Sequence, residues 1–250
     1  MMADNKNKTP ILELRKLCRY FGGLKAVNNV TFEVAEGEIV GLIGPNGSGK
    51  TTTLNLITGF LKPDAGAIKL QTENIASLPR HQICRKGVAR TFQLVKPFLG
   101  FTALQNVMVG RMYGQACTPN MQVAAEESRE LLARVGLEKK ANTLARDLTL
   151  MQRKRLELAR ALAAKPRLLL LDELMAGLNP TEVDEACDLI RQIRDSHITI
   201  IVVEHIVKAI CGLSNRILVL NMGEKIAEGL PDEIIHHPQV IDVYLGRAHA

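Results

Sequence analysis

The stretch that most constrains this chain runs from Gly44 to Thr51, "GPNGSGKT", between the apolar run "EIVGLI" and a segment with helical spacing. It fits the pattern G-x-x-x-x-G-K-[ST] in the strand, loop and helix context that the pattern requires. Gly44, Gly47 and Gly49 permit backbone conformations that turn successive N–H groups inward, which makes an anion nest at the positive end of a helix. The sequence therefore predicts a phosphate-binding loop and a nucleotide site.

The residue types at the end of this loop indicate their roles. Lys50 can bridge the β- and γ-phosphates of a nucleotide, and the Thr51 hydroxyl can coordinate Mg²⁺. The other loop positions that we expect to contact the nucleotide are Asn46, Ser48 and Thr52.

Two further apolar runs end in polar residues that suit the same chemistry. "LLLLDE" places Asp172 and Glu173 at the C-terminal end of a buried strand, where parallel sheets bind ligands. Asp172 would hold a water on Mg²⁺, and Glu173 would orient the attacking water. "IVVEH" places His205 at the end of another strand, where it would contact the γ-phosphate. The alternatives are an ordinary acidic strand end and a structural histidine.

The distribution of elements along the chain predicts the fold class. Short β-branched runs alternate with Gly-containing turns up to residue 70, give way to helical spacing between about residues 93 and 148, and return at "RLLLLDE" and "HITIIVVEH". Apolar runs joined by helices predict a parallel sheet with right-handed crossovers, into which a mostly helical lobe is inserted. "RILVLNMGEKIAEG" predicts a hairpin that turns at residues 221–224, followed by two short C-terminal helices.

Composition excludes several other classes of protein. The 250 residues carry a net charge of +6, but three Tyr, six Phe and no Trp argue against a nucleic-acid stacking surface. The five cysteines show no CxxC or CxxH spacing, so we expect reduced thiols in a cytosolic protein. "MMADNKNKTP" has no apolar signal region, and the longest apolar runs fall far short of the ~20 residues that span a bilayer. A membrane role would thus require a partner.

Six motifs follow one another along the chain: "GPNGSGKTT", "TFQ", "LTLMQRKRLELARAL", "LLLLDE", "AGLNP" and "VEH". This set resembles the ATP-binding subunits of ABC transporters over essentially the whole chain. "YFGGLKAVNNVTF", "RTFQ", "AGLNPTE" and "VIDVYLG" resemble the ATPases of branched-chain amino-acid type importers in particular. The resemblance implies a single α/β domain over residues 1–250. Residues 11–92 and 153–250 would form a P-loop NTPase (RecA-like) core with an N-terminal antiparallel β portion, and residues 93–152 would form the α-helical subdomain.

The resemblance also implies roles for individual residues. Phe21 would lie against the adenine base, with Tyr20 as the alternative. Gln93 would reach Mg²⁺ and the attacking water while it links the helical lobe to the sheet. Asn179 would lie in a loop that crosses between two ATPase subunits, where many relatives have Asp. Leu174 stands where a Pro commonly follows the catalytic Glu, so the loop gains an N–H and a freer φ.

The chain departs most from the family at Leu148 to Gln152, where the family pattern L-S-G-G-Q binds the γ-phosphate held by the opposite subunit. Thr149 and Gln152 form a T-x-x-Q capping box, which predicts a helix start with free N–H donors. Leu150 and Met151 carry side chains that would crowd a phosphate at that helix end. The alternative is a capped core helix that meets no ligand.

The function that the resemblance implies is ATP hydrolysis, with Mg²⁺, that energises import of branched-chain-type amino acids or related small solutes. The partners would be two membrane permease subunits, a second ATP-binding subunit and, indirectly, an extracytoplasmic solute-binding protein. The second subunit would form a homodimer or a heterodimer with this chain, and the altered signature favours a heterodimer. The chain would lie peripherally on the cytoplasmic face of the inner membrane. The alternatives are a soluble ABC-type ATPase switch and a low-turnover nucleotide-binding regulatory subunit.

Overall fold

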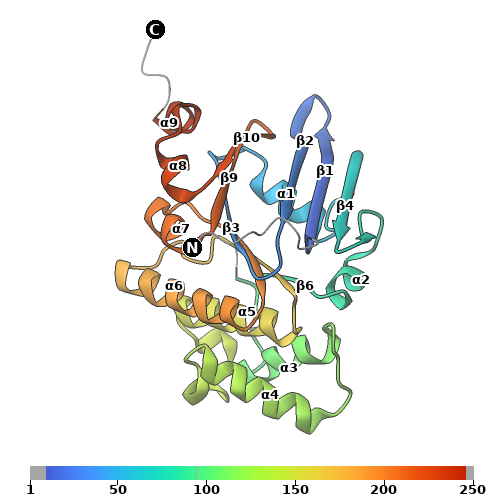
Figure 1. Cartoon of the computed structure of the whole chain (residues 1–250). Helices are drawn as coiled ribbons and strands as arrows, with labels where there is room; N and C mark the ends of the chain where they lie inside the picture. The colour runs from blue at the N-terminus through green and yellow to red at the C-terminus, as the bar shows by residue number, and fades with distance from the viewer. Residues whose placement is uncertain (1–9, 94, 246–250) are drawn as a thin grey trace.

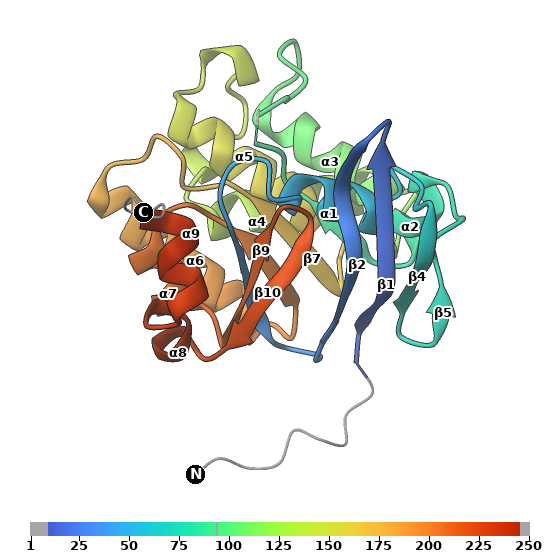
Figure 2. The same ribbon diagram turned by 90° about the horizontal axis from the view of Figure 1, so that it is seen from above.

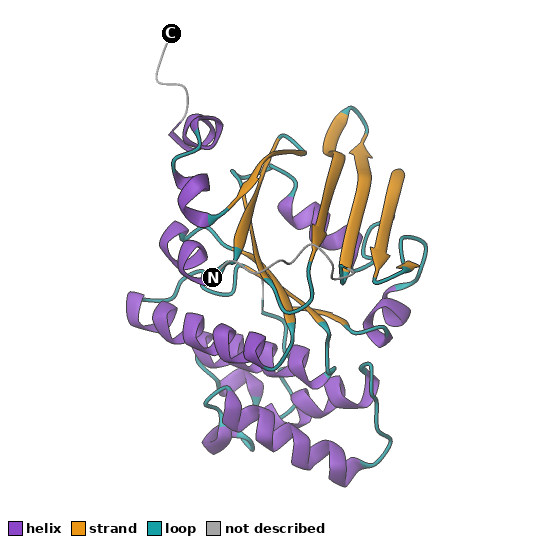
Figure 3. Cartoon of the chain, viewed as in Figure 1, coloured by secondary structure: helices purple, strands orange, loops and turns teal. Residues whose placement is uncertain are grey.

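The computed structural model of the chain describes residues 10–93 and 95–245, so most of "MMADNKNKTP" and the final glycine of "VIDVYLG" lie outside the described residues. The strands are β1 (Leu12–Phe21), β2 (Leu24–Val34), β3 (Ile39–Ile43), β4 (Ala65–Leu70), β5 (Glu73–Asn74), β6 (Val88–Arg90), β7 (Leu168–Asp172), β8 (Thr199–Val203), β9 (Arg216–Asn221) and β10 (Glu224–Gly229). The helices are α1 (Lys50–Ile57), α2 (Arg80–Arg85), α3 (Ala103–Tyr113), α4 (Met121–Arg134), α5 (Leu150–Ala163), α6 (Pro180–Asp195), α7 (Val207–Leu213), α8 (Pro231–Ile235) and α9 (Pro238–Leu245), as Figures 1 and 3 show.

The central sheet has the strand order β10-β9-β3-β8-β7-β6. Strands β9, β3, β8, β7 and β6 pair in parallel, and β10 joins the edge as the antiparallel arm of a hairpin. Every residue of β3, β7 and β8 is buried, because helices or the second sheet cover both faces of these strands. The C-terminal ends of β3, β7 and β8 therefore meet at one edge of the sheet.

A second, antiparallel sheet has the order β2-β1-β4-β5. Its inward side chains pack with α1 and with one face of the central sheet in a common apolar cluster that includes Leu14, Val30, Leu42, Leu54 and Val203. Figure 2 shows β1, β2 and β4 beside the central strands, with α1 between the two layers. This sheet is the antiparallel β portion expected near the N-terminus.

Helices α3 and α4 form a lobe at the end of the molecule opposite β1 and β2 (Figure 1). Helix α5 packs against both of them and also contacts β6, so it connects the lobe to the sheet. The proposed boundary between residues 152 and 153 falls inside α5, and the division into core and subdomain remains a prediction. Among the described residues, no helix is long and apolar enough to cross a membrane.

Candidate active site

The phosphate loop follows β3 directly, and its glycines adopt the expected backbone conformations. Gly44, Gly47 and Gly49 have φ of 149°, 78° and 104°, which side-chain-bearing residues rarely adopt. A Cβ on Gly44 would lie 2.1 Å from the carbonyl oxygen of Leu220, and a Cβ on Gly49 would lie 2.4 Å from that of Ala26. The loop is thus pressed against β9 and β2, and Gly47 faces open space.

Lys50 is the first residue of α1 and is buried. Its Nζ donates to the carbonyl oxygens of Gly44 and Pro45 at 2.7 and 2.9 Å, so the cation lies inside the loop. Burial lowers the pKa of the Lys50 ammonium, and the negative charges of Glu173 and Asp172 oppose that change. The structure therefore brings the cation of the loop near the two carboxylates at the C-terminal end of β7. Of the remaining loop residues, Asn46 and Thr51 are exposed, Thr52 is half-buried and Ser48 is buried.

The Glu173 carboxylate lies between two other predicted catalytic residues, Gln93 and His205. Its Oε2 accepts a hydrogen bond from Gln93 Nε2 at 2.6 Å, and its Oε1 pairs with His205 Nε2 at 2.7 Å. The Glu173 N–H donates to the Val203 carbonyl oxygen at 2.9 Å, and its φ is 51°. Hydrogen bonds on both carboxylate oxygens fix the direction of this side chain, which is the property that a group orienting a water needs.

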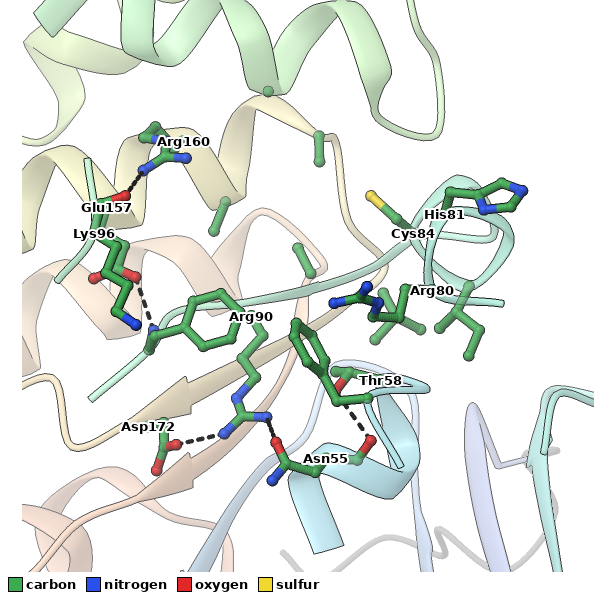
Figure 4. A pocket seen from close by; sticks show the side chains of 18 of the residues that line it. Asn55, Thr58, Arg80, His81, Cys84, Arg90, Lys96, Glu157, Arg160 and Asp172 are labelled. Carbon is green, nitrogen blue, oxygen red and sulfur yellow. Dashed lines mark hydrogen bonds and ion pairs between the residues drawn. The ribbon is translucent and has the colours of Figure 1, made fainter. Parts of the chain in front are cut away.

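Asp172 is buried and paired with a residue that the sequence analysis did not identify. Its Oδ2 accepts from Arg90 at 2.6 Å, and the same guanidinium donates to Asn55 Oδ1 at 2.7 Å, as Figure 4 shows. Asp172 Oδ1 is buried without a hydrogen-bond partner among the described residues. This carboxylate and Thr51 line the same cavity, and a carboxylate oxygen and a hydroxyl are donors that suit Mg²⁺ and its waters.

The two aromatic candidates for the adenine contact lie at the end of β1, where both side chains are exposed. The Arg19 guanidinium covers the Phe21 ring at 4.9 Å from its centroid, and the Tyr20 hydroxyl bonds to Asn28 Oδ1 at 3.2 Å. The choice between Phe21 and Tyr20 therefore stays open.

The altered signature segment forms the expected capped helix start. Thr149 Oγ1 accepts from the Gln152 N–H at 3.3 Å, and Gln152 Oε1 accepts from the Thr149 N–H at 3.1 Å. The Leu150 side chain is 56% exposed, so it faces solvent at the helix start, which disagrees with the alternative of a capped core helix at this residue. A Cβ on Gly177 would lie 3.9 Å from the Leu150 side chain, which places the "AGLNP" loop beside this helix start.

Asn179 in that loop has a local structural role. Its Oδ1 accepts from the Glu182 N–H at 3.0 Å, while the Glu182 carboxylate accepts from the Asn179 N–H at 2.9 Å. This capping box, with Pro180 in the first turn, begins α6.

Three buried charged residues near the site, Lys154, Glu157 and Glu204, were also missed. Glu157 Oε1 accepts from the Phe92 N–H at 2.9 Å, which ties α5 to the residue before Gln93. Burial raises the pKa of the Glu157 carboxyl to about 7. Helical spacing in the sequence could have indicated that Lys154 and Glu157 are buried. Both residues fall on the same face of α5 as the apolar residues Leu158 and Ala161.

A cavity of about 860 Å³ extends from Thr51, Asp172 and Gln93 to the helical lobe. Figure 4 shows charged side chains along it, among them Arg80, Arg90, Lys96, Glu157 and Arg160. The exposed rings of Phe60, Phe92 and Tyr113 add apolar surface. The cavity therefore joins the predicted hydrolysis site to a mixed basic and aromatic surface between sheet and lobe.

Comparison with known proteins gives two family-model matches. Residues 27–176 match the model described as "ABC transporter", and residues 224–250 match that described as "Branched-chain amino acid ATP-binding cassette transporter". The chain is 44% identical over 252 aligned residues to the "High-affinity branched-chain amino acid transport ATP-binding protein LivG" of Salmonella typhimurium, covering 96% of this chain and 99% of that protein.

Solved structures of ATP-binding cassettes are also similar. The ADP conformation of MJ1267, an ATP-binding cassette of an ABC transporter, superposes with a TM-score of 0.87 at 28% identity, covering 95% of this chain and 99% of that one. The dimeric, post-hydrolysis cassette MJ0796 bound to ADP and Pi gives a TM-score of 0.80 at 26% identity, covering 88% of this chain and 98% of that one.

Proposed function

The chain belongs to the ABC transporter family of ATP-binding cassettes, and from this premise we propose that it is the ATPase subunit of an importer for branched-chain amino acids or closely related small solutes. Membership in the family confirms the expected fold and the ATPase class. The observation that carries the proposal is the Glu173 carboxylate, held between Gln93 and His205 near Lys50. The match of residues 224–250 and the identity to LivG support the solute class.

The roles that we propose for the site follow from its geometry. The N–H groups of the loop and the Lys50 ammonium would bind the nucleotide phosphates, and Thr51, Gln93 and Asp172, the last through a water, would hold Mg²⁺. When bound, Mg²⁺ neutralises developing charge on the phosphates. Glu173 would orient the attacking water, because both of its oxygens are fixed by neighbours.

A second ATP-binding subunit would complete each nucleotide site. We assign the helix start at Thr149 to the nucleotide of the partner subunit, since Thr149 and Leu150 are exposed at the positive end of α5. The Leu150 side chain stands where the family has a glycine, so this contact would be weak. A heterodimer with a partner that carries an intact signature is therefore favoured. Purified homodimers that hydrolyse ATP as fast as the complete transporter would contradict this assignment.

Two permease subunits would dock where the cavity opens between sheet and lobe, because a contact there is continuous with Gln93. An extracytoplasmic solute-binding protein would act indirectly, through the permeases. The chain would then lie peripherally on the cytoplasmic face of the membrane. Phe92 and Tyr113 supply exposed apolar anchors for such a contact, and Arg80 and Lys96 supply positive charge.

The experiment that tests this function is co-purification with candidate permease subunits, followed by uptake and ATPase assays in vesicles. We expect ATP-dependent uptake of a branched-chain amino acid, and Glu173→Gln is expected to abolish turnover while ATP still binds. Turnover of Glu173→Gln at the parental rate would exclude the assigned role. A complex that binds ATP with negligible turnover would instead favour the alternative of a low-turnover regulatory subunit. The side chains of Leu150 and Met151 at the signature position are the reason to consider that alternative.

A further inference from the structure

The backbone that follows Glu173 is held by two buried side chains of opposite charge. Lys154 Nζ, from α5, donates to the carbonyl oxygen of Leu174 at 2.8 Å and also to that of Ala176. Glu204 Oε1, from the residue after β8, accepts from the Met175 N–H at 2.6 Å. Residues 174–176 are thus held at three main-chain atoms, which belong to two peptide units, by side chains from two distant parts of the chain.

This segment needs an external restraint. Glu173 has a left-handed φ of 51°, a conformation that an L side chain rarely adopts unless its surroundings enforce it. Leu174 lacks the ring that would fix φ in a proline. The turn closes with only a 3.3 Å bond from the Ala176 N–H to the Glu173 carbonyl oxygen. The bonds from Lys154 and Glu204 therefore supply stiffness that the local sequence does not.

The electrostatic environment shows that the two side chains depend on each other. Lys154 is 5% exposed and Glu204 is 3% exposed. Burial lowers the pKa of Lys154, while the facing charges of Glu204, Glu157 and Glu173 raise it. Burial raises the pKa of Glu204 to about 7, and the Met175 N–H and the Lys154 ammonium oppose that rise. Each charge therefore offsets part of the cost of burying the other.

We propose that Lys154 and Glu204 are positioning residues for ATP hydrolysis, which fix residues 174–176 so that the Glu173 carboxylate stays between Gln93 and His205. The inference rests on the proposed role of Glu173 and is independent of the transported solute. Because Lys154 belongs to α5, it also ties this backbone to the helix that begins at Thr149. Glu204 precedes His205, so the same segment is tied to the histidine.

Through Lys154, helix α5 is connected to the backbone that follows Glu173. A shift of α5, when its N-terminus meets the nucleotide of the partner subunit, would pull on the carbonyl groups of Leu174 and Ala176. Glu173 lies one residue before this pair. Binding at one nucleotide site would thereby set the position of the carboxylate in the other site.

The test compares Lys154→Met, Lys154→Arg and the matched control Arg155→Met in the full chain. Arg155 is the next residue on α5, and its guanidinium pairs with the half-exposed Glu185 outside this segment. For Lys154→Met we expect kcat for ATP to fall about tenfold or more, since charge-assisted hydrogen bonds are lost, with the KM for ATP unchanged. Lys154→Arg restores most of kcat, and Arg155→Met stays near the parent.

Hydrogen–deuterium exchange gives a readout that does not depend on turnover. Peptides covering residues 173–178 should exchange about tenfold faster in Lys154→Met than in the parent, with α1 and β3 unchanged. Unchanged kcat, unchanged exchange at 173–178, or an equal loss of kcat and nucleotide affinity would each overturn the proposal. A parent without any turnover would refute the proposed function instead, and the exchange result alone would then decide the positioning role.

A second variant covers the case in which Lys154→Met fails to fold because Glu204 loses its facing cation. Lys154→Met combined with Glu204→Gln removes both charges and keeps an acceptor for the Met175 N–H. We expect the same fall in kcat and the same faster exchange, since the carbonyl groups of Leu174 and Ala176 still lose their donor. Parental kcat and exchange in the double variant would overturn the proposal.

Discussion

Glu157→Gln tests whether a buried carboxyl beside the Gln93 segment costs the fold stability at neutral pH. The Glu157 side chain is 5% exposed, and its Oε2 lacks a hydrogen-bond partner among the described residues. Burial raises its pKa from 4.5 to about 7, although the Phe92 N–H and the charges of Arg160, Lys154 and Arg90 oppose the rise. Gln keeps an acceptor for Phe92 and removes the ionisable group.

The sign and size of the effect follow from proton linkage. The folded chain binds the Glu157 proton more tightly than the unfolded chain, so the parental free energy of unfolding falls as pH rises from 4.5 to about 7. At roughly 1.4 kcal/mol per pKa unit, the full cost is about 3 kcal/mol. The variant avoids this cost. Its stability advantage should be near zero at pH 4.5, grow through pH 5–7 and level off above pH 7.

Thermal unfolding followed by circular dichroism at pH 5, 6, 7 and 8 measures this difference. About 3 kcal/mol corresponds to a Tm gap of roughly 6–12 °C at pH 8 for a chain of this length, narrowing toward pH 5. Glu126→Gln, on the exposed face of α4, is the matched control and should show a small gap that does not vary with pH. A pH-independent gap for Glu157→Gln, or a variant less stable than the parent at pH 8, would refute the reasoning.

Three further changes have defined outcomes. Arg90→Met should lower the free energy of unfolding by about 3–5 kcal/mol in urea titrations at pH 7, because Asp172 stays buried without its cation; a loss below 1 kcal/mol would contradict this. Thr149→Ala should cost about 1 kcal/mol, whereas Thr149→Ser should be close to neutral, and equal melting temperatures for all three proteins would exclude the capping role. Leu150→Gly combined with Met151→Gly should raise ATP turnover of the assembled transporter, measured by phosphate release, and unchanged turnover would show that the side chains do not crowd the phosphate.

The parts of the fold that the sequence predicts are those encoded by local patterns. The strand that becomes β7 is a continuous apolar run, and such a run predicts burial on both faces. The glycines of the phosphate loop and the T-x-x-Q pattern at Thr149 specify backbone geometry within a few residues. Position at the end of a parallel strand was sufficient to bring Glu173 and His205 together, because parallel strands share an edge.

The parts that were missed depend on contacts between distant segments. Arg90 pairs with a carboxylate 82 positions away, and nothing in the local sequence distinguishes it from an exposed arginine. The exposure of Leu150 was not missed in this way, because a side chain that crowds a phosphate at a helix start has to lie outside the core. Lys154 and Glu204 escaped notice because their partners are backbone atoms of residues 174–176, whose position only the tertiary structure fixes.

The order of strands in the central sheet sets the distance between the phosphate loop and the two acidic residues at the end of β7. Strand β8 lies between β3, which leads into the phosphate loop, and β7, which ends at Asp172. Neighbouring strands are about 4.8 Å apart, so two intervals set the loop and the acidic pair about 10 Å apart. Strand β8 occupies that gap, and its main-chain hydrogen bonds to β3 and β7 maintain it. Substitutions among the apolar side chains of β8 can therefore change stability while the spacing between cation and carboxylates stays the same.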